Sequence, residues 1–322
     1  LQLLDDTQRP LRALFRTEVR GLENLPPAGT RMLIAPNHVS LIDGPLLHAI
    51  LPHKYVDHTH ADAMLSVSNS PDGEKRIRDI YGSKAVVIPY IMAGFDLAAY
   101  CAREFPRQAT KNTLGMVLLS HGVFSFAQDA RESYELMIEL VSMAERYLEA
   151  NKAWSLGLAP TSPPEFKREE AAKLRHEVSR AAGFPLLCRC NASPQFVGFA
   201  RHPEVKRISQ SGPATPDHVI RTKPLPMLGR DVARFGTAYR VYFENNAKNT
   251  KQAKTILDPA PRMALDPELG LVAFGRTAKD AGMVEDLYEH TIEIILRAEA
   301  LGGWQALAER HIFDVEYCDL QQ

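Results

Sequence analysis

The sequence has few cysteines, no long apolar run and no signal-peptide pattern in its first residues. Four cysteines in 322 residues are too few for a disulfide framework, and Cys188 and Cys190 stand closer together than the cysteine pairs of structural zinc sites. We therefore expect reduced thiols in a cytoplasmic protein. No stretch reaches the roughly 18 apolar residues that a membrane span needs. The first residues lack the basic-then-apolar order of a signal peptide. They also lack an initiator Met, as expected for a fragment.

The chain also has almost no net charge, with 38 Lys and Arg against 39 Asp and Glu. A protein so close to neutrality has no bulk electrostatic attraction to nucleic acid or to an anionic membrane. The G-x-G-x-x-G fingerprint of dinucleotide-binding proteins is missing too, so we expect no NAD binding by this chain. With 45% hydrophobic residues, the composition is typical of a globular protein. A length of 322 residues is enough for two domains.

Hydrophobic periodicity predicts alternating strands and helices along the chain. Apolar runs typical of buried strands lie at 84–91, 115–126 and 185–190, with a further candidate at 238–244. Helical spacing is found at 73–82, 95–105, 129–152, 168–182 and from Thr277 toward Leu301. The pattern predicts an α/β fold, with a layered α/β/α domain around a mixed central sheet and a second α/β domain.

Two segments of the chain resemble each other. HGVFSFAQDARESYELMIEL (121–140) can be laid over LGLVAFGRTAKDAGMVEDLY (269–288), because each has an apolar pair and a Phe after a Gly and then enters a long helix. Any β-turn-α unit shares these features, so a chance likeness is an alternative. His121 is aligned with Leu269. If the two segments arose by duplication, only the first copy could therefore bind a metal.

Three histidines form the strongest candidate for chemistry. Alternate residues of a strand point to the same face, so His58 and His60 can reach one ion. His121, at a turn after another strand, would add a third imidazole. Three protein ligands and an open position are typical of catalytic zinc. Two exposed histidines at this spacing also arise without a metal, so the residues alone leave both interpretations open.

The segments around these histidines resemble the class II aldolase/adducin family. LHAILPHKYVDHTHADAML (47–65) is similar to its metal-binding region, and PDGEKRIRDIYG, VIPYIMAGFDLA and GMVLLSHGVFSFAQDARESYELMIELV extend the likeness. The second half is similar to the branch in which a rhamnulose-1-phosphate aldolase module precedes a short-chain dehydrogenase. The segments that carry this second likeness are SGPATPDHVIRTKPLP (211–226), DPAPRMALDPELGLVAFGRTAKDA (258–281) and FDVEYCDL (313–320).

The resemblance implies a metal-dependent aldolase in which His58, His60 and His121 hold a divalent metal, expected to be zinc. In the family, the metal chelates dihydroxyacetone phosphate and stabilises the enediolate left by cleavage of a ketose 1-phosphate. Rhamnulose 1-phosphate would give dihydroxyacetone phosphate and lactaldehyde. The resemblance also implies a homo-oligomer, because neighbouring subunits can complete the site.

Two features depart from the family pattern. The family's acid/base carboxylate should stand four residues before His48, but Gly44 is there, and Asp43 is a candidate one residue off register. The glycine- and asparagine-rich segment that binds the substrate phosphate in the family has no counterpart in residues 1–45. A non-catalytic binding module, as in the adducin-like members, is therefore an alternative to an aldolase.

Residues 15–47 instead resemble the beginning of the glycerolipid acyltransferase family. The NHxSxxDG pattern of that family is present as Asn37, His38, Ser40, Asp43 and Gly44. The spacing lets Asp43 orient the His38 imidazole, which would deprotonate a glycerophosphate hydroxyl. The phosphate-binding FPEGTR-like block of that family does not follow, so an acyltransferase is the second alternative.

We predict four segments from these patterns. They are an acyltransferase-like segment at 1–46, an aldolase-like metal-binding domain at 47–155, a proline-rich linker at 156–166 and a second α/β domain at 167–322. Other charged or polar residues are expected to be structural or solvated. They are His48, His53, His218, Arg221, Lys223 and Arg262. The three cations could alternatively contact a phosphate. Asp217 and His218 lie in a family-like segment, which leaves a role in the pocket open.

Overall fold

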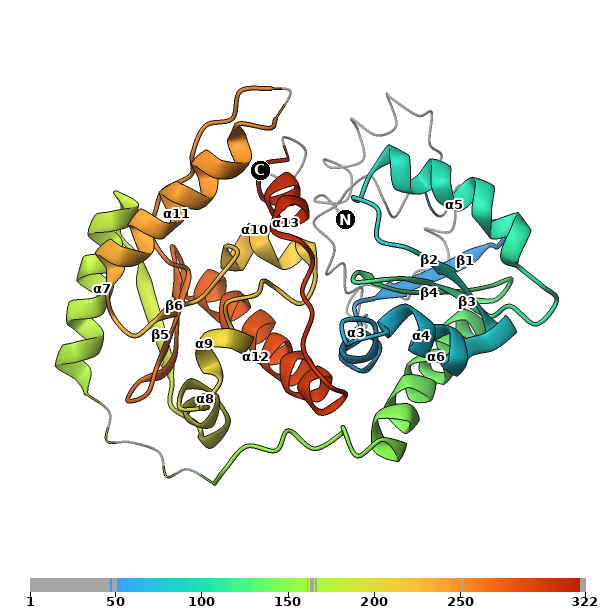
Figure 1. Cartoon of the computed structure of the whole chain (residues 1–322), viewed down its shortest axis with the longest axis horizontal. Coiled ribbons are helices and arrows are strands. Elements are labelled where there is room, and N and C mark those ends of the chain that lie inside the picture. Colours follow the sequence, from blue (N-terminus) through green and yellow to red (C-terminus); the bar gives the residue numbers. More distant parts are fainter. Residues whose placement is uncertain are drawn as a thin grey trace, which may run out of the picture. The chain divides into compact units, whose positions relative to one another are not determined.

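The structure is a computed structural model that describes Leu47 and residues 51–160, 162, 165, 167–250 and 252–318. All of these residues belong to one compact unit, His38–Gln322. Within it, two four-stranded mixed sheets are each covered by helices (Figure 1). The predicted α/β fold class is confirmed.

The first sheet has the strand order β1-β4-β3-β2. Its strands are β1 (Tyr55–Thr59), β2 (Ala85–Ile88), β3 (Gly115–Leu118) and β4 (Gly122–Ala127). β4 pairs antiparallel with both β1 and β3, and β2 pairs parallel with β3. The helices of this half are α3 (Asp62–Ser68), α4 (Gly73–Tyr81), α5 (Phe95–Gln108) and α6 (Ala130–Ala150), with a short 3-10 helix η2 (Gly82–Lys84).

Alternating side chains of the first sheet pack against opposite layers, as the period of a strand requires. Val86, Met116 and Phe124 belong to a buried cluster with α5. Their neighbours Val87 and Val117 belong to another cluster, with α3, α4 and α6. Both faces of the sheet are therefore covered, in three layers. This explains why β2, β3 and β4 are mostly apolar runs rather than alternating patterns.

The second sheet has the strand order β5-β8-β7-β6. Its strands are β5 (Leu187–Asn191), β6 (Met227–Leu228), β7 (Met263–Asp266) and β8 (Gly270–Gly275). The helices of this half are α7 (Arg168–Ala182), α8 (Pro194–Ala200), α9 (Val205–Ile208), η3 (Pro216–His218), α10 (Val219–Thr222), α11 (Val232–Ala247), α12 (Ala278–Ala300) and α13 (Glu309–Glu316). Helices α7 and α11 cover one face of this sheet, and α8 and α12 cover the other (Figure 1).

The two sheets repeat one topology. β8 pairs antiparallel with β5 and β7, and β6 pairs parallel with β7, which reproduces the first sheet strand for strand. The alignment of His121 with Leu269 also lays β4 over β8 and the first residue of α6 over that of α12. The two segments whose likeness the sequence left open as a duplication or a chance similarity therefore lie at equivalent places of one repeated topology.

One predicted element is wrong. Residues 238–244 form part of helix α11, not a strand. Val232, Gly236 and Tyr239 are buried at helical spacing, and Asp231 caps the helix by accepting a hydrogen bond from the backbone of Arg234. Aromatic side chains favour strands only as a weak preference, which packing in the folded protein overrides here.

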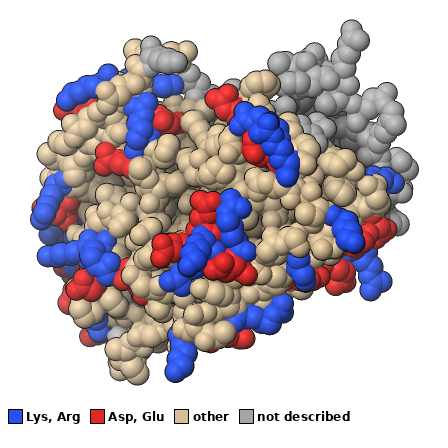
Figure 2. All heavy atoms as spheres, turned by 45° about the vertical axis from the view of Figure 1, so that its right-hand side comes forward, with Lys and Arg blue, Asp and Glu red and all other residues tan. Residues whose placement is uncertain are grey.

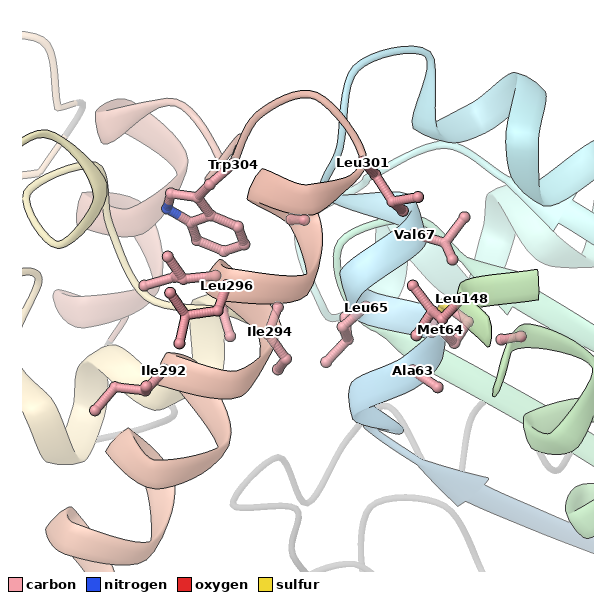
Figure 3. Close-up of a cluster of buried hydrophobic side chains, with 14 of the residues drawn as sticks. Ala63, Met64, Leu65, Val67, Leu148, Ile292, Ile294, Leu296, Leu301 and Trp304 are labelled. Atoms are coloured by element: carbon pink, nitrogen blue, oxygen red, sulfur yellow. The ribbon is translucent and has the colours of Figure 1, made fainter. Parts of the chain in front are cut away.

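Helices α3 and α12 pack directly against each other and join the two halves. Leu65 on α3 and Ile294 on α12 point toward one another in this contact and are fully buried (Figure 3). Polar contacts add to it, because the Asn69 side chain donates to the Ala214 carbonyl at 2.8 Å and the Arg76 guanidinium donates to the Leu301 carbonyl at 3.0 Å. A shared core thus fixes the first half against the second, while the predicted domain boundaries stay a prediction.

The surface carries charges of both signs side by side. On the face in Figure 2, Lys and Arg side chains alternate with Asp and Glu, in keeping with the formal net charge of −1. No helix among the described residues is long and apolar enough to cross a membrane. None of the four cysteines, all of which lie in the described part of the chain, is paired in a disulfide.

Candidate metal centre

The three candidate histidines come from two neighbouring strands. His58 lies on the edge strand β1, and His60 follows it directly. His121 precedes β4, the strand that pairs with β1, and its backbone amide donates to the Leu118 carbonyl at 3.2 Å in the turn after β3. Ser120 adopts a left-handed backbone conformation (φ 56°) in this turn. The pairing of β1 with β4 therefore brings His121 beside the two histidines of the H-x-H motif.

The three imidazoles form one compact group. One nitrogen from each ring lies within 4.8 Å of the chosen nitrogens of the other two. The ring centroids of His60 are 5.0 Å from those of both His58 and His121, and the remaining pair is 5.4 Å apart. His121 is buried, and the other two rings are half-buried. Among the residues that the structure describes, this is the one group of His, Cys, Asp and Glu with such spacing.

Contacts around His58 fix its orientation. Its Nδ1 lies 3.1 Å from the Val123 carbonyl oxygen, which can only accept, so Nδ1 donates. This tautomer leaves the lone pair on Nε2, the nitrogen available to ligate a metal. The ring also stacks on Phe124, with centroids 3.9 Å apart. A histidine that ligates a metal through one ring nitrogen usually donates a hydrogen bond from the other, as Nδ1 of His58 does to the Val123 carbonyl.

Gly122 gives the histidines the space they occupy. A Cβ atom at this position would lie 2.6 Å from Cε1 of His58, 2.7 Å from the Thr59 carbonyl oxygen and 3.0 Å from Cδ2 of His60. Contacts under 3.0 Å are not tolerated without movement. The H-x-H strand therefore approaches β4 this closely only because residue 122 is a glycine.

A carboxylate from the second half also reaches the histidines. Oδ2 of Asp217, in η3, lies 3.9 Å from Nε2 of His60 and 3.8 Å from Nε2 of His121. His218 is buried beside it, with its ring centroid 6.5 Å from that of His60, and burial lowers the pKa of His218 to about 4. The sequence only left a pocket role open for these two residues. Because they are far along the chain from the H-x-H motif, no spacing between residues could predict that they lie beside it.

Asp62, the first acidic residue after the H-x-H motif, contacts a histidine outside the three-histidine group. The Asp62 carboxylate at the start of α3 lies 2.7 Å from Nδ1 of His290 on α12. The hydrogen bond to Asp62 holds the pKa of His290 above its usual range. This pair contributes to the contact between α3 and α12 rather than to the three-histidine group.

The second repeat has lost the histidines. Cys190 pairs with Val272 as His58 pairs with Phe124, so Cys190 occupies the position of His58. Ala192 and Leu269 occupy the positions of His60 and His121. The close approach of the strands is retained, because a Cβ at Gly270 would lie 2.2 Å from the Asn191 carbonyl oxygen. The architecture is thus kept in both repeats and the candidate ligands in one.

Two cations that were expected at the surface are placed elsewhere. Lys223 is only 3% exposed, with its Nζ 3.6 Å from the centroid of the Tyr239 ring. Burial lowers the pKa of Lys223 to about 8. Arg262 is half-buried and ion-paired with Asp258, so the interpretation of both as solvated charges is wrong. Arg221 is exposed, as expected.

The other sequence-predicted site residues are not brought to this group. His38, Asp43 and His48 lie outside the described residues, so the acid/base role of Asp43 and the acyltransferase motif stay predictions. His53 stacks on Phe126, with ring centroids 4.4 Å apart, which supports the structural role expected for it.

Family models match both halves of the chain. The model of the class II aldolase and adducin N-terminal domain matches residues 44–148, which include all three histidines. The model of the second domain of class II aldolase matches residues 165–322, which include Asp217. The chain belongs to the class II aldolase/adducin family. The first repeat lies within the match to the N-terminal domain and the second within the match to the second domain, so the family's second domain is the half that has lost the histidines.

This class II aldolase/adducin chain is similar to a curated protein and to a solved structure. It is 29% identical over 300 residues to the uncharacterized oxidoreductase YuxG of Bacillus subtilis (strain 168), a match that covers 86% of this chain and 43% of the relative. The chain thus spans less than half the length of that relative. It is also similar to the N-terminal class II aldolase domain of a conserved protein from Thermoplasma acidophilum. That likeness has 40% sequence identity and a TM-score of 0.29, and covers 32% of this chain and 46% of the other.

Proposed function

We propose that the chain is a metal-dependent class II aldolase that cleaves a ketose 1-phosphate such as rhamnulose 1-phosphate to dihydroxyacetone phosphate and lactaldehyde. The observation that carries the proposal is the grouping of three imidazoles from the end of β1 and the turn before β4. Family membership supports a carbon–carbon lyase. The choice of sugar rests on the likeness of residues 211–226 and 258–281 to the rhamnulose-1-phosphate branch.

The residues present fit a divalent metal. Neutral imidazoles are the usual ligands of zinc in catalytic sites, and the three of this chain are close enough to share one ion. His58, His60 and His121 would hold it. When bound, such a metal polarises the carbonyl and hydroxyl oxygens of a substrate as a Lewis acid. Zinc is the metal we propose.

The protein orients the His58 ring and partly shields the three-histidine group from water. The Val123 carbonyl holds the His58 tautomer, and Phe124 holds the plane of its ring. His121 is 2% exposed, and His218 beside it is neutral near pH 7 because burial lowers its pKa. Electrostatic interactions at this position are therefore stronger than they would be in water.

Several expectations accompany the proposal. The sugar phosphate is the expected partner, and assembly into a homo-oligomer is proposed from the family resemblance. We also infer that this chain alone does not bind NAD, because the sequence lacks the G-x-G-x-x-G fingerprint. A cytoplasmic location stays a prediction, which rests on the low number of cysteines in the sequence.

The aldolase proposal predicts cleavage of at least one ketose 1-phosphate in a panel that includes rhamnulose 1-phosphate. Formation of carbonyl products by the zinc-loaded protein is the measurement. We expect the His121→Ala variant and a chelator each to reduce the rate by about 1000-fold, since the several kcal/mol that a metal contributes to charge stabilisation correspond to such a factor.

The exposed His176 on α7 provides the matched control, because it lies away from the three-histidine group. The His176→Ala variant should retain the wild-type rate. If the metal-loaded wild type forms no carbonyl product from any sugar of the panel, the aldolase proposal is wrong. The non-catalytic binding module is then the function to pursue.

A further inference from the structure

We infer that Asp217, in the second half of the chain, is a fourth protein ligand of the metal that the three histidines of the first half would hold. The inference rests on the proposed metal-binding function and extends it. It assigns a chemical role to the second repeat, which has no ligand set of its own at the equivalent position. The two halves would then build one metal centre together.

Asp217 is held at the histidines by its position in the fold. It lies in the 3-10 helix η3, where Pro216 restricts the backbone and the Thr215 carbonyl accepts from the amide of His218 at 3.3 Å. Helix α10 follows directly and packs on α12, which in turn packs on α3. Because α3 begins two residues after His60, this chain of contacts fixes the carboxylate relative to the H-x-H motif.

The Asp217 carboxylate is buried and under-satisfied. Its side chain is 10% exposed, and Oδ2 is fully buried without a hydrogen-bond partner among the described residues. A buried carboxylate oxygen needs a hydrogen-bond donor or a cation to offset its loss of hydration. The Nε2 atoms of His60 and His121 lie 3.9 and 3.8 Å from Oδ2, which is too far for hydrogen bonds.

These distances suit donors that share an ion. Zinc lies about 2.0–2.2 Å from imidazole nitrogen and carboxylate oxygen, so two donors on a tetrahedral ion are about 3.4 Å apart. The 3.8 and 3.9 Å separations exceed that value by a few tenths of an ångström. A direct hydrogen bond would require a shortening of almost 1 Å. Of the two arrangements, an ion shared with His60 and His121 therefore requires the smaller change in these two distances.

The charge of Asp217 also matches the need of the site. Three neutral imidazoles leave the two positive charges of a zinc ion uncompensated in a partly buried position. One carboxylate reduces the net charge of the centre and strengthens its hold on the metal. Catalytic zinc can expand to five donors, so a fourth protein ligand is compatible with substrate binding.

Cobalt substitution tests the inference without measuring activity. The wild type and the Asp217→Asn and Asp217→Cys variants are loaded with Co²⁺, and their absorption spectra and chelator-competition affinities are recorded. If Asp217 is a ligand, Asp217→Asn weakens binding by about 100-fold, at the upper end of the effects seen for outer-shell partners, and changes the visible bands. Asp217→Cys acquires a thiolate-to-cobalt charge-transfer band in the near ultraviolet, which requires a direct bond.

Asp62→Asn is the matched control, because it removes a nearby negative charge whose carboxylate is hydrogen-bonded to His290. This variant should retain the wild-type spectrum and an affinity within about 3-fold, well below the loss expected for a ligand. Wild-type spectra and affinity in Asp217→Asn, with no charge-transfer band in Asp217→Cys, would overturn the inference and leave the three-histidine centre standing. Failure of the wild type to bind Co²⁺ would instead overturn the proposed function beneath it. Circular dichroism of the metal-free variants shows that each is folded.

Discussion

Replacing Gly122 with alanine is expected to weaken binding of zinc by about 100-fold, the range seen when the support of a metal ligand is removed. The new Cβ would lie 2.6 Å from the His58 ring and 2.7 Å from the Thr59 carbonyl oxygen. The Thr59 carbonyl is part of the backbone of β1, which pairs with β4. The clash therefore cannot be relieved by a flexible side chain, and β1 itself must move. Movement of β1 displaces His58 and His60 together, and the third imidazole alone holds a metal poorly.

Zinc affinity measured by chelator competition checks this prediction. Gly282→Ala in α12 is the control, because a Cβ there would meet only the end of the Arg189 side chain, at 3.6 Å. Alanine is also a better helix former than glycine, so the control should be at least as stable as the wild type. An unchanged zinc affinity in Gly122→Ala would show that the close approach of the two strands does not position the ligands.

Replacing Ile294 with alanine is expected to lower the free energy of unfolding by about 2–5 kcal/mol, the range for deleting a fully buried aliphatic side chain. Ile294 is 0% exposed and faces Leu65 where α12 packs on α3 (Figure 3). The vacated space has helices on both sides that are fixed by their own sheets, so collapse of the cavity is limited. The measurement is urea denaturation of the metal-free protein, followed by circular dichroism.

Ile138 on α6 is the matched control for Ile294, because the same side chain is 47% exposed there. Ile138→Ala should change the free energy of unfolding by no more than about 0.5 kcal/mol. A similar small effect of Ile294→Ala would contradict the account in which the contact of α3 with α12 joins the two halves. It would also weaken the argument that this contact places Asp217 at the histidines.

The sequence predicted the parts of the fold that depend on local order. Apolar runs marked β2 and β3 because both faces of the first sheet are buried, and helical spacing marked α6 and α12. The misassigned 238–244 segment shows the limit of local preference. Its aromatic residues favour a strand, but Tyr239 is buried at helical spacing from Gly236 and Val232, in contacts that come from distant parts of the chain.

The candidate site divides in the same way. His58 and His60 are brought together by the alternation of a single strand, and His121 joins them through strand pairing that the family resemblance anticipated. Asp217 reaches them only through the packing of α10, α12 and α3, which no spacing in the sequence encodes. The burial of Lys223 was hidden for the same reason, since its partners Tyr239 and Asp258 are far along the chain.

The central claim is that the three histidines hold a divalent metal, and elemental analysis of the purified protein tests it most directly. The wild type and the His58→Ala/His60→Ala double variant are purified side by side without chelators and with zinc supplied. The account predicts about one zinc or similar ion per chain in the wild type, as in a mononuclear three-histidine site, and its loss in the double variant. No bound metal in the wild type, or an equal amount in both proteins, would contradict it.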